Sequence, residues 1–125
     1  MNKIRVLVKE PGKAPEERKI ESTLKAFQTI VGGHVEGVCI YDDVCCYIND
    51  ERKFKNLEPN FVLPIRRASG YDVVCGPAVF FRVDLEGNEA SLTLTDILYL
   101  DRLLLDSDAA NFILNGRPLA ELWEA

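Results

Sequence analysis

The chain's single histidine, His34, stands two residues before Glu36 in an apolar-rich run. In a strand, both side chains point to the same face, because alternate residues share a face. An imidazole beside a carboxylate is typical of a divalent-metal site or of general acid–base catalysis. The simpler alternative is a solvated strand face on which the pair does no chemistry. A small enzyme or metal-binding protein centred on His34 and Glu36 is therefore one of two interpretations.

A hairpin would bring two further polar residues to this face. Two apolar-rich runs flank Asp42 and Asp43, and a turn made of these two residues alone places Cys39 opposite Cys46. The candidate catalytic set then consists of two facing pairs, which are His34 with Glu51 and Glu36 with Asn49. A three-residue loop would shift every pair. Since no third firm ligand and no nucleophile completes the set, we expect no metal and no cofactor.

The four cysteines offer a different chemistry, either zinc binding or thiol redox. They are Cys39, Cys45, Cys46 and Cys75. No Cys-x-x-Cys spacing occurs, so the usual ligand pattern of a structural zinc site is missing. A low thiol pKa needs a nearby cation or a helix N-terminus, whereas the predicted hairpin supplies Asp42 and Asp43. We interpret the cysteines as reduced, buried core residues.

The glycine pair Gly32-Gly33 could in principle cradle a phosphate. Phosphate-binding glycine loops precede a helix, where free N–H groups and the positive end of the dipole meet the anion. Here the glycines follow a predicted helix that has Leu24, Phe27 and Val31 on one face. Free carbonyls at that end would repel phosphate, whereas a left-handed glycine commonly ends a helix. We interpret the pair as a helix stop.

Charge is unevenly distributed along the chain. The net charge is -5, with 13 Lys and Arg against 11 Asp and Glu in residues 1–83, and two Arg against nine acidic residues in residues 84–125. A duplex-binding protein presents a dense basic face, so nucleic acid is not the expected partner. The densest basic group, near Phe54 and Phe61, comprises Lys53, Lys55, Arg66 and Arg67. It could hold a nucleic-acid strand, but a solvated loop is the simpler interpretation.

Periodicity predicts an α+β fold with a small, mainly antiparallel sheet, one helix in the N-terminal half and C-terminal helices. The expected strands are residues 3–9, 18–21, 34–41, 44–49, 61–65 and 73–84, the last broken at Gly76-Pro77. The first helix is expected to begin at an N-cap, Ser22. A second helix at 92–105, capped by Thr93 or Thr95, has an apolar stripe formed by Leu94, Ile97, Leu98, Leu100, Leu104 and Leu105. Pro118 suits the first turn of a last helix.

Several stretches together resemble one family. They are PGKAPEERKIESTLKAFQTIVGGHVE, INDERK, NLEPN and DVVCGPAVFFRVDLEGNEASLTLTDI. The chain is similar to a bacterial and phage domain-of-unknown-function family, number thirty-eight forty-six, over about residues 3–98. The most specific motif consists of Thr23, Leu24, Gln28, Val31, Gly32, Gly33 and Glu36. His34 departs from an expected aromatic residue, commonly tyrosine, which argues against a shared histidine chemistry; Asp50-Glu51-Arg52 also replaces a more usual acidic-acidic-glycine turn.

The resemblance implies a small α+β domain often carried on mobile genetic elements, with no established activity and so no catalytic residues to transfer. We expect a single domain over residues 1–125, in which a family-like core of about 3–98 precedes a helical, acidic extension of about 99–125. Without the apolar run of a signal peptide or the length of a membrane span, the sequence predicts a cytoplasmic protein with no membrane partner.

The leading hypothesis is a non-enzymatic accessory or protein-interaction module of mobile-element origin. Its expected contact surface is the acidic C-terminal segment, which also carries the apolar residues Phe112, Ile113, Leu114, Leu119, Leu122 and Trp123. The partner is an unknown protein, or a second copy bound through the C-terminal helices. The alternatives are the small enzyme or metal-binding protein centred on His34 and Glu36, and an acidic DNA mimic.

Overall fold

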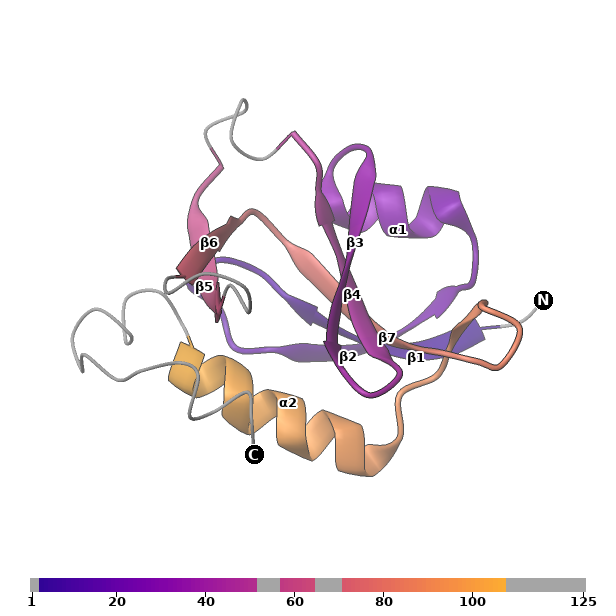
Figure 1. The fold of residues 1–125 in the computed structure, drawn as a ribbon. Coiled ribbons are helices and arrows are strands. Elements are labelled where there is room, and N and C mark those ends of the chain that lie inside the picture. The colour runs from indigo at the N-terminus through magenta and orange to yellow at the C-terminus, as the bar shows by residue number, and fades with distance from the viewer. Residues whose placement is uncertain (1–2, 52–56, 65–70, 108–125) are drawn as a thin grey trace.

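The computed structural model describes residues 3–51, 57–64 and 71–107 and shows the predicted α+β fold. Within these residues, six antiparallel strands form the main sheet and two form a small second sheet (Figure 1). The main sheet comprises β1 (Lys3–Lys9), β2 (Glu16–Glu21), β3 (Val35–Tyr41), β4 (Val44–Asn49), β7 (Ala78–Val83) and β8 (Glu89–Ala90). The small sheet pairs β5 (Pro59–Pro64) with β6 (Tyr71–Cys75), and the helices are α1 (Leu24–Val31) and α2 (Leu94–Ser107).

The main sheet separates two apolar cores. Its strands lie in the order β2-β1-β7-β4-β3, with β8 beside β7, so β1, β7 and β4 are interior strands. In β1, Val6 and Val8 belong to one core and Leu7 to the other. Helix α1 covers the first, here called the α1 core, whereas α2 and the β5–β6 pair cover the second, the α2 core (Figure 1). The alternation of side chains along the interior strands thus places the two helices on opposite faces.

Helix α1 begins and ends at residues with identifiable roles. Its N-cap is Thr23, whose Oγ1 accepts a hydrogen bond from the Ala26 N–H at 3.2 Å. The prediction of Ser22 was therefore wrong by one residue, because it is Thr23 that has the extended backbone of an N-cap. At the other end, Gly32 has a left-handed φ of 81° and donates its N–H to the Gln28 carbonyl at 2.9 Å. The prediction of a glycine helix stop is confirmed.

The β3–β4 hairpin has the predicted turn and a different register. The two predicted aspartates form the turn between Tyr41 and Val44. An irregularity between Cys39 and Tyr41 then shifts the rest of β3 by one residue. As a result, Cys39 faces Cys45 and not Cys46, so the predicted register was wrong. The prediction of four buried cysteines was also wrong: Cys46 is buried, whereas Cys39 is exposed and the other two are half-buried.

Asn60 fastens the small sheet to the main one. Its side-chain amide donates to the carbonyls of Lys9 at 2.7 Å and Gly76 at 2.9 Å, and its Oδ1 accepts from the Lys9 ammonium at 2.9 Å. Gly76 has a φ of +81°, and a Cβ there would lie 2.7 Å from Cδ1 of Leu57. The predicted break at Gly76-Pro77 is confirmed, since β6 lies in the small sheet and β7 in the main sheet.

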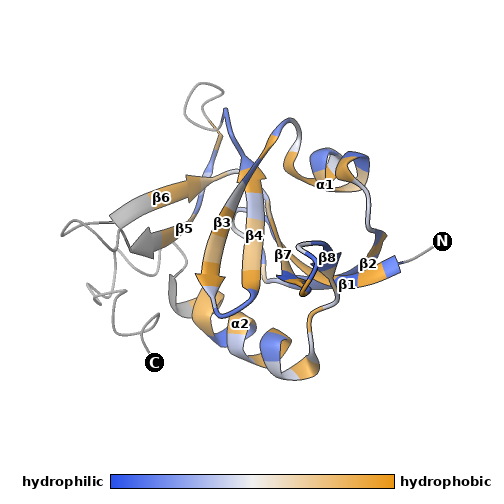
Figure 2. Ribbon diagram, turned by 45° about the vertical axis from the view of Figure 1, so that its right-hand side comes forward, coloured by the Kyte–Doolittle hydropathy of each residue, from blue (hydrophilic) through white to orange (hydrophobic). Residues whose placement is uncertain are grey.

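Helix α2 buries only half of its predicted apolar stripe. The buried members are Ile97, Leu100 and Leu104, and the exposed members are Leu94, Leu98 and Leu105. Leu103, outside the predicted stripe, is buried as well, and polar and apolar segments alternate along the α2 ribbon (Figure 2). The helix continues through residue 99, where the acidic extension was expected to begin. The helix expected at Pro118 and the apolar residues 112–123 lie outside the described residues.

The helices in the described ranges are not of the membrane-spanning kind, since each falls short of the length and apolar character that a bilayer crossing requires.

Candidate functional site

The register shift separates two of the four predicted site residues. Glu36 pairs with Ile48, and Asn49 pairs with Val35. Ile48 belongs to the α2 core, whereas Val35 packs against the α1 core. Because directly paired side chains share a face, Glu36 and Asn49 lie on opposite faces of the sheet. The structure does not bring them together as the predicted hairpin did.

Of the four candidates, His34 and Glu51 lie at the surface, whereas Asn49 packs against the end of α1. His34 and Glu51 are exposed, and the His34 carbonyl accepts a hydrogen bond from the Asp50 N–H at 3.1 Å. Asn49 is buried; its amide donates to the Val31 carbonyl at 3.2 Å, and its Oδ1 accepts from the Glu51 N–H at 2.8 Å. Asn49 therefore ties the end of α1 to β4. In the described part of the chain, no three His, Cys, Asp or Glu side chains are grouped so that they could hold a metal ion.

The basic group considered for nucleic-acid binding lies outside the described residues; its members are Lys53, Lys55, Arg66 and Arg67. The nearby aromatic Phe61 is described, and its side chain is 0% exposed in the α2 core. A buried ring cannot stack on a nucleotide base without leaving the core. Phe61 is thus part of the fold and not of a binding platform.

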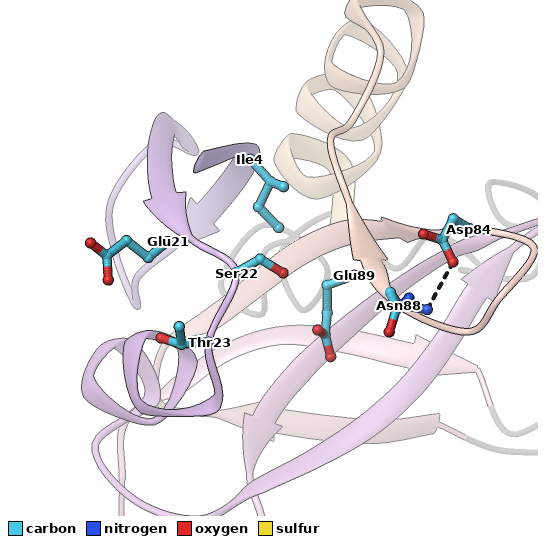
Figure 3. Close-up of a pocket in the computed structure, with 7 residues that line it drawn as sticks. All are labelled: Ile4, Glu21, Ser22, Thr23, Asp84, Asn88 and Glu89. Carbon is cyan, nitrogen blue, oxygen red and sulfur yellow. Dashed lines mark hydrogen bonds between the residues drawn. The ribbon is translucent and has the colours of Figure 1, made fainter. Parts of the chain in front are cut away.

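A polar hollow of about 450 Å³ opens between the β2–α1 connection and the β7–β8 hairpin (Figure 3). Ile4 provides its apolar wall, and its polar lining consists of Glu21, Ser22, Thr23, Asp84, Asn88 and Glu89. In Figure 3 the carboxylate of Glu21 points away from the other labelled side chains. Asp84 Oδ1 already accepts from the N–H groups of Glu86 and Asn88, both at 2.9 Å. Asp84 therefore serves the turn that it belongs to.

Glu89, also in this hollow, makes a strong hydrogen bond. Its Oε2 accepts from the Tyr47 hydroxyl at 2.6 Å. Burial, together with the hydrogen bond to Glu89 and the charge of that carboxylate, raises the pKa of Tyr47 to about 12. At neutral pH, Tyr47 is consequently a neutral donor, and its bond to Glu89 joins β4 to β8. The polar contacts around this hollow thus stabilise the fold.

An ion pair fastens the N-terminal end of α2 to the sheet. Arg82 donates from Nε and Nη2 to the two carboxylate oxygens of Asp96, at 2.6 and 2.9 Å. Asp96 also forms a capping box with Thr93, in which each backbone N–H donates to the other side chain, at 2.9 and 3.0 Å. The Tyr41 hydroxyl donates to Asp96 Oδ1 at 3.1 Å. Thr93, rather than Thr95, is thus the cap, and the Thr-x-x-Asp spacing was the sequence signal for Asp96 that we missed.

These contacts fix the protonation of the cluster. Burial would raise the pKa of Asp96, but the hydrogen bonds from Arg82, Thr93 and Tyr41 outweigh it and lower the pKa to about 2. Burial and the hydrogen bond to Asp96 raise the pKa of Tyr41 far above its ordinary value. The hydrogen bond to Asp96 also raises the pKa of Arg82. Although the three side chains border a hollow of about 350 Å³, they bind one another, and their role is to hold α2 in place.

The outer face of α2, defined by Leu94, Leu98 and Leu105, carries three exposed leucines and has the exposed Asp101 on the same side of the helix. The three leucines are 65%, 72% and 63% exposed, respectively. With 3.6 residues per turn, they fall within about 40° of one another around the helix axis. The opposite side of the helix supplies Leu100 and Leu103 to the α2 core. Helix α2 therefore has apolar side chains on two sides, only one of which the described chain covers.

Residues 4–104 match the model of a protein family. The match spans both cores and the capped helix α1, and it ends inside α2. No curated protein and no solved structure matches the chain. The family is the one that the sequence motifs resemble, and the match covers well over half of the chain. The chain therefore belongs to the family described as Domain of unknown function (DUF3846).

Proposed function

We propose that this protein is a protein-interaction module that binds its partner through the outer face of α2. The observation that carries the proposal is the exposure of Leu94, Leu98 and Leu105 on one side of a helix whose other side closes the α2 core. Single surface leucines are ordinary, whereas leucines aligned along one helix face are typical of a helix that docks into an apolar groove.

The rigidity of α2 makes its outer face an efficient contact surface. Full burial of each leucine side chain contributes about 1.5–3 kcal/mol, and the cost of ordering the binding element is subtracted from that gain. The ordering cost is small here, because the Arg82–Asp96 pair and the buried Leu100 hold the helix before any partner binds. The face is therefore preorganised for binding.

The charges around α2 favour a protein partner with a basic rim. Between residues 84 and 105, the exposed acidic residues are Asp84, Glu86 and Asp101 and the basic residue is Arg102, whereas Asp96 is buried and paired with Arg82. An acidic surround repels the phosphates of nucleic acid. A DNA mimic would use an acidic array as its contact surface, whereas this face carries three exposed leucines and a single acidic residue, Asp101. The interaction module is therefore preferred over the mimic.

The setting that we propose is a cytoplasmic accessory role on a mobile genetic element, which rests on the family resemblance and on the sequence pattern. The genes that flank the coding sequence test it. Integrase, phage structural or conjugation genes beside it support the setting, and a stable neighbourhood of housekeeping genes contradicts it.

The contact surface itself can be tested by site-specific photocrosslinking. A photoreactive amino acid replaces Leu98 in the full chain, and the crosslinked partner is identified by mass spectrometry after irradiation of host cells. The matched control carries the same amino acid at Leu85, which is fully exposed on the β7–β8 turn. We expect a crosslink from position 98 that is absent from position 85 and that is lost when Leu94→Glu is added.

The affinity of the identified complex then separates specific docking from chance proximity. Leu98→Glu should weaken binding at least about tenfold, equivalent to about 1.4 kcal/mol, while the melting temperature stays unchanged because the side chain is exposed. A crosslink to a second copy of the chain would also support this face as the contact surface, and the partner would then be another copy of the same protein. Equal crosslinks from positions 85 and 98, or an unchanged affinity of Leu98→Glu, would overturn the proposal.

A further inference from the structure

Two thiols meet on the edge of the main sheet. Cys39 on β3 lies directly opposite Cys45 on β4, and the Cys45 thiol donates a hydrogen bond to Cys39 Sγ at 3.5 Å. The Cα atoms of directly opposed residues in an antiparallel pair are about 4.5–5.5 Å apart, which is within the range that a disulfide bridges. To form the bond, the sulfur atoms must approach from 3.5 Å to about 2.05 Å.

We propose that Cys39 and Cys45 are a modification site at which a hydroperoxide forms a reversible intramolecular disulfide. This inference is independent of the function proposed for α2. Cys39 is exposed, so it is not a core residue, and an oxidant in solvent can reach its sulfur. Cys39 and Cys45 both line a hollow of about 210 Å³, together with Gly37, Tyr47 and Phe81. A small hydroperoxide can therefore approach the pair.

The two cysteines have different surroundings and different roles. Burial, the hydrogen bond to Cys39 and the charges of Cys39 and nearby Asp43 raise the pKa of Cys45 to about 11. Cys45 therefore keeps its proton at neutral pH and donates it toward Cys39, which is the sulfur that solvent reaches first. Cys46, adjacent in sequence, points to the opposite face and is buried in the α2 core. The geometry thus selects Cys45 over Cys46 as the partner.

The reaction proceeds in two balanced steps. The Cys39 sulfur attacks the hydroperoxide; an S–O bond forms, the O–O bond breaks, and an alcohol or water leaves, so that Cys39 becomes a sulfenic acid. The Cys45 sulfur then attacks Cys39 Sγ; the S–S bond forms, the S–O bond breaks, and the hydroxyl leaves as water with the Cys45 proton. Two thiols are oxidised, and one hydroperoxide is reduced. A cellular thiol reverses the reaction by exchange.

The disulfide would act on an edge strand. Among the described strands, β3 is the last of the main sheet, and it is paired with β4. A disulfide would join β3 to β4 covalently. After its reduction, the two strands would be held together by their backbone hydrogen bonds and side-chain packing. In a reducing compartment such a disulfide is transient, as expected for a site that responds to oxidant.

Peptide mapping tests the proposal with hydrogen peroxide as the probe. The reduced full chain is oxidised, its remaining thiols are alkylated, and the chain is cleaved after Tyr41, which separates Cys39 from Cys45. We expect the loss of two hydrogen atoms from the intact mass, a crosslinked pair of peptides, and full reversal by dithiothreitol. Cys46→Ala and Cys75→Ser should keep the crosslink.

A trapping experiment identifies the order of the steps. In Cys45→Ser, the Cys39 sulfenic acid has no partner and should react with dimedone, whereas wild type should be labelled much less. The proposal is overturned if both Cys39 and Cys45 remain fully alkylatable after oxidation. It is also overturned if the crosslink persists in Cys45→Ser or joins two chains.

Discussion

At the residue scale, the best-defined polar chemistry in the described chain is structural. Asp96 receives hydrogen bonds from Arg82, Tyr41 and Thr93, and it ties the first turn of α2 to β7 and β3. His34, which the sequence singled out, is exposed. A lone histidine attracts attention because of its chemistry, yet the sequence does not show whether partners surround it. No role was predicted for Asp96, although a Thr-x-x-Asp spacing before an apolar run is a recognised signal for the start of a helix.

The pKa of Asp96 leads to a prediction about pH. Its folded pKa of about 2 lies below the ordinary value of 3.8, so the carboxylate stabilises the fold above pH 4, and this contribution is lost as pH falls from about 4 to 2. This lowering of the pKa corresponds to on the order of 2 kcal/mol of folding stability. Solvent screens the interaction little, because the Asp96 side chain is only 4% exposed. We expect urea unfolding to show that Asp96→Asn is less stable at pH 7 and has a weaker pH dependence between pH 4 and 2.

Asp101, on the same helix, provides the control of opposite sign. Burial and the nearby charge of Glu17 raise the pKa of Asp101, so its ionisation opposes folding above its unfolded pKa. Asp101→Asn should not destabilise the protein at pH 7. An Asp96→Asn variant with the wild-type slope between pH 4 and 2 would show that the ion pair does not hold α2.

At the element scale, the sequence predicted where most strands and helices lie and failed on how they face one another. The strand at residues 3–9 and the hairpin turn after Tyr41 were predicted correctly, whereas β2 begins at Glu16 and not at Arg18. The β3–β4 register could not be predicted, because an irregularity between Cys39 and Tyr41 leaves no signature in the residue types. Helix α2 has leucines on two sides, so periodicity alone could not tell the buried stripe from the exposed one.

The end of α1 allows a test of an element boundary. Gly32 has a φ of 81°, and a Cβ at this position would meet nothing within 4 Å. The cost of Gly32→Ala is therefore conformational and should be about 1 kcal/mol, measured by chemical denaturation. Gly37, whose φ is not positive and whose added Cβ would meet the Tyr47 ring at 3.4 Å, is the control, and Gly37→Ala should cost much less. Equal losses of stability in the two variants would contradict the assignment of Gly32 as the helix stop.

At the scale of the whole molecule, the sheet divides the fold into two cores, each of which needs its own cover. Helix α1 closes one core from within the N-terminal half, whereas the other is closed by α2 and the β5–β6 pair. The sequence separated a family-like core from an extension at residue 99, yet Leu100, Leu103 and Leu104 lie beyond that point and are buried. The family match, which ends at residue 104, includes them. The covering helix thus belongs to the matched fold.

This dependence predicts the outcome of two truncations. A chain that ends after Asp84 loses the four buried apolar residues of α2, which are Ile97, Leu100, Leu103 and Leu104. Full burial of four such side chains contributes roughly 6–12 kcal/mol, which is comparable to the whole stability of a small domain. We therefore expect residues 1–84 to aggregate or to melt without a cooperative transition. A chain that ends after Ser107 retains α2 and should melt cooperatively, as measured by circular dichroism. A soluble, cooperatively melting 1–84 fragment would show that α2 is a separable binding arm and not a cover of the core.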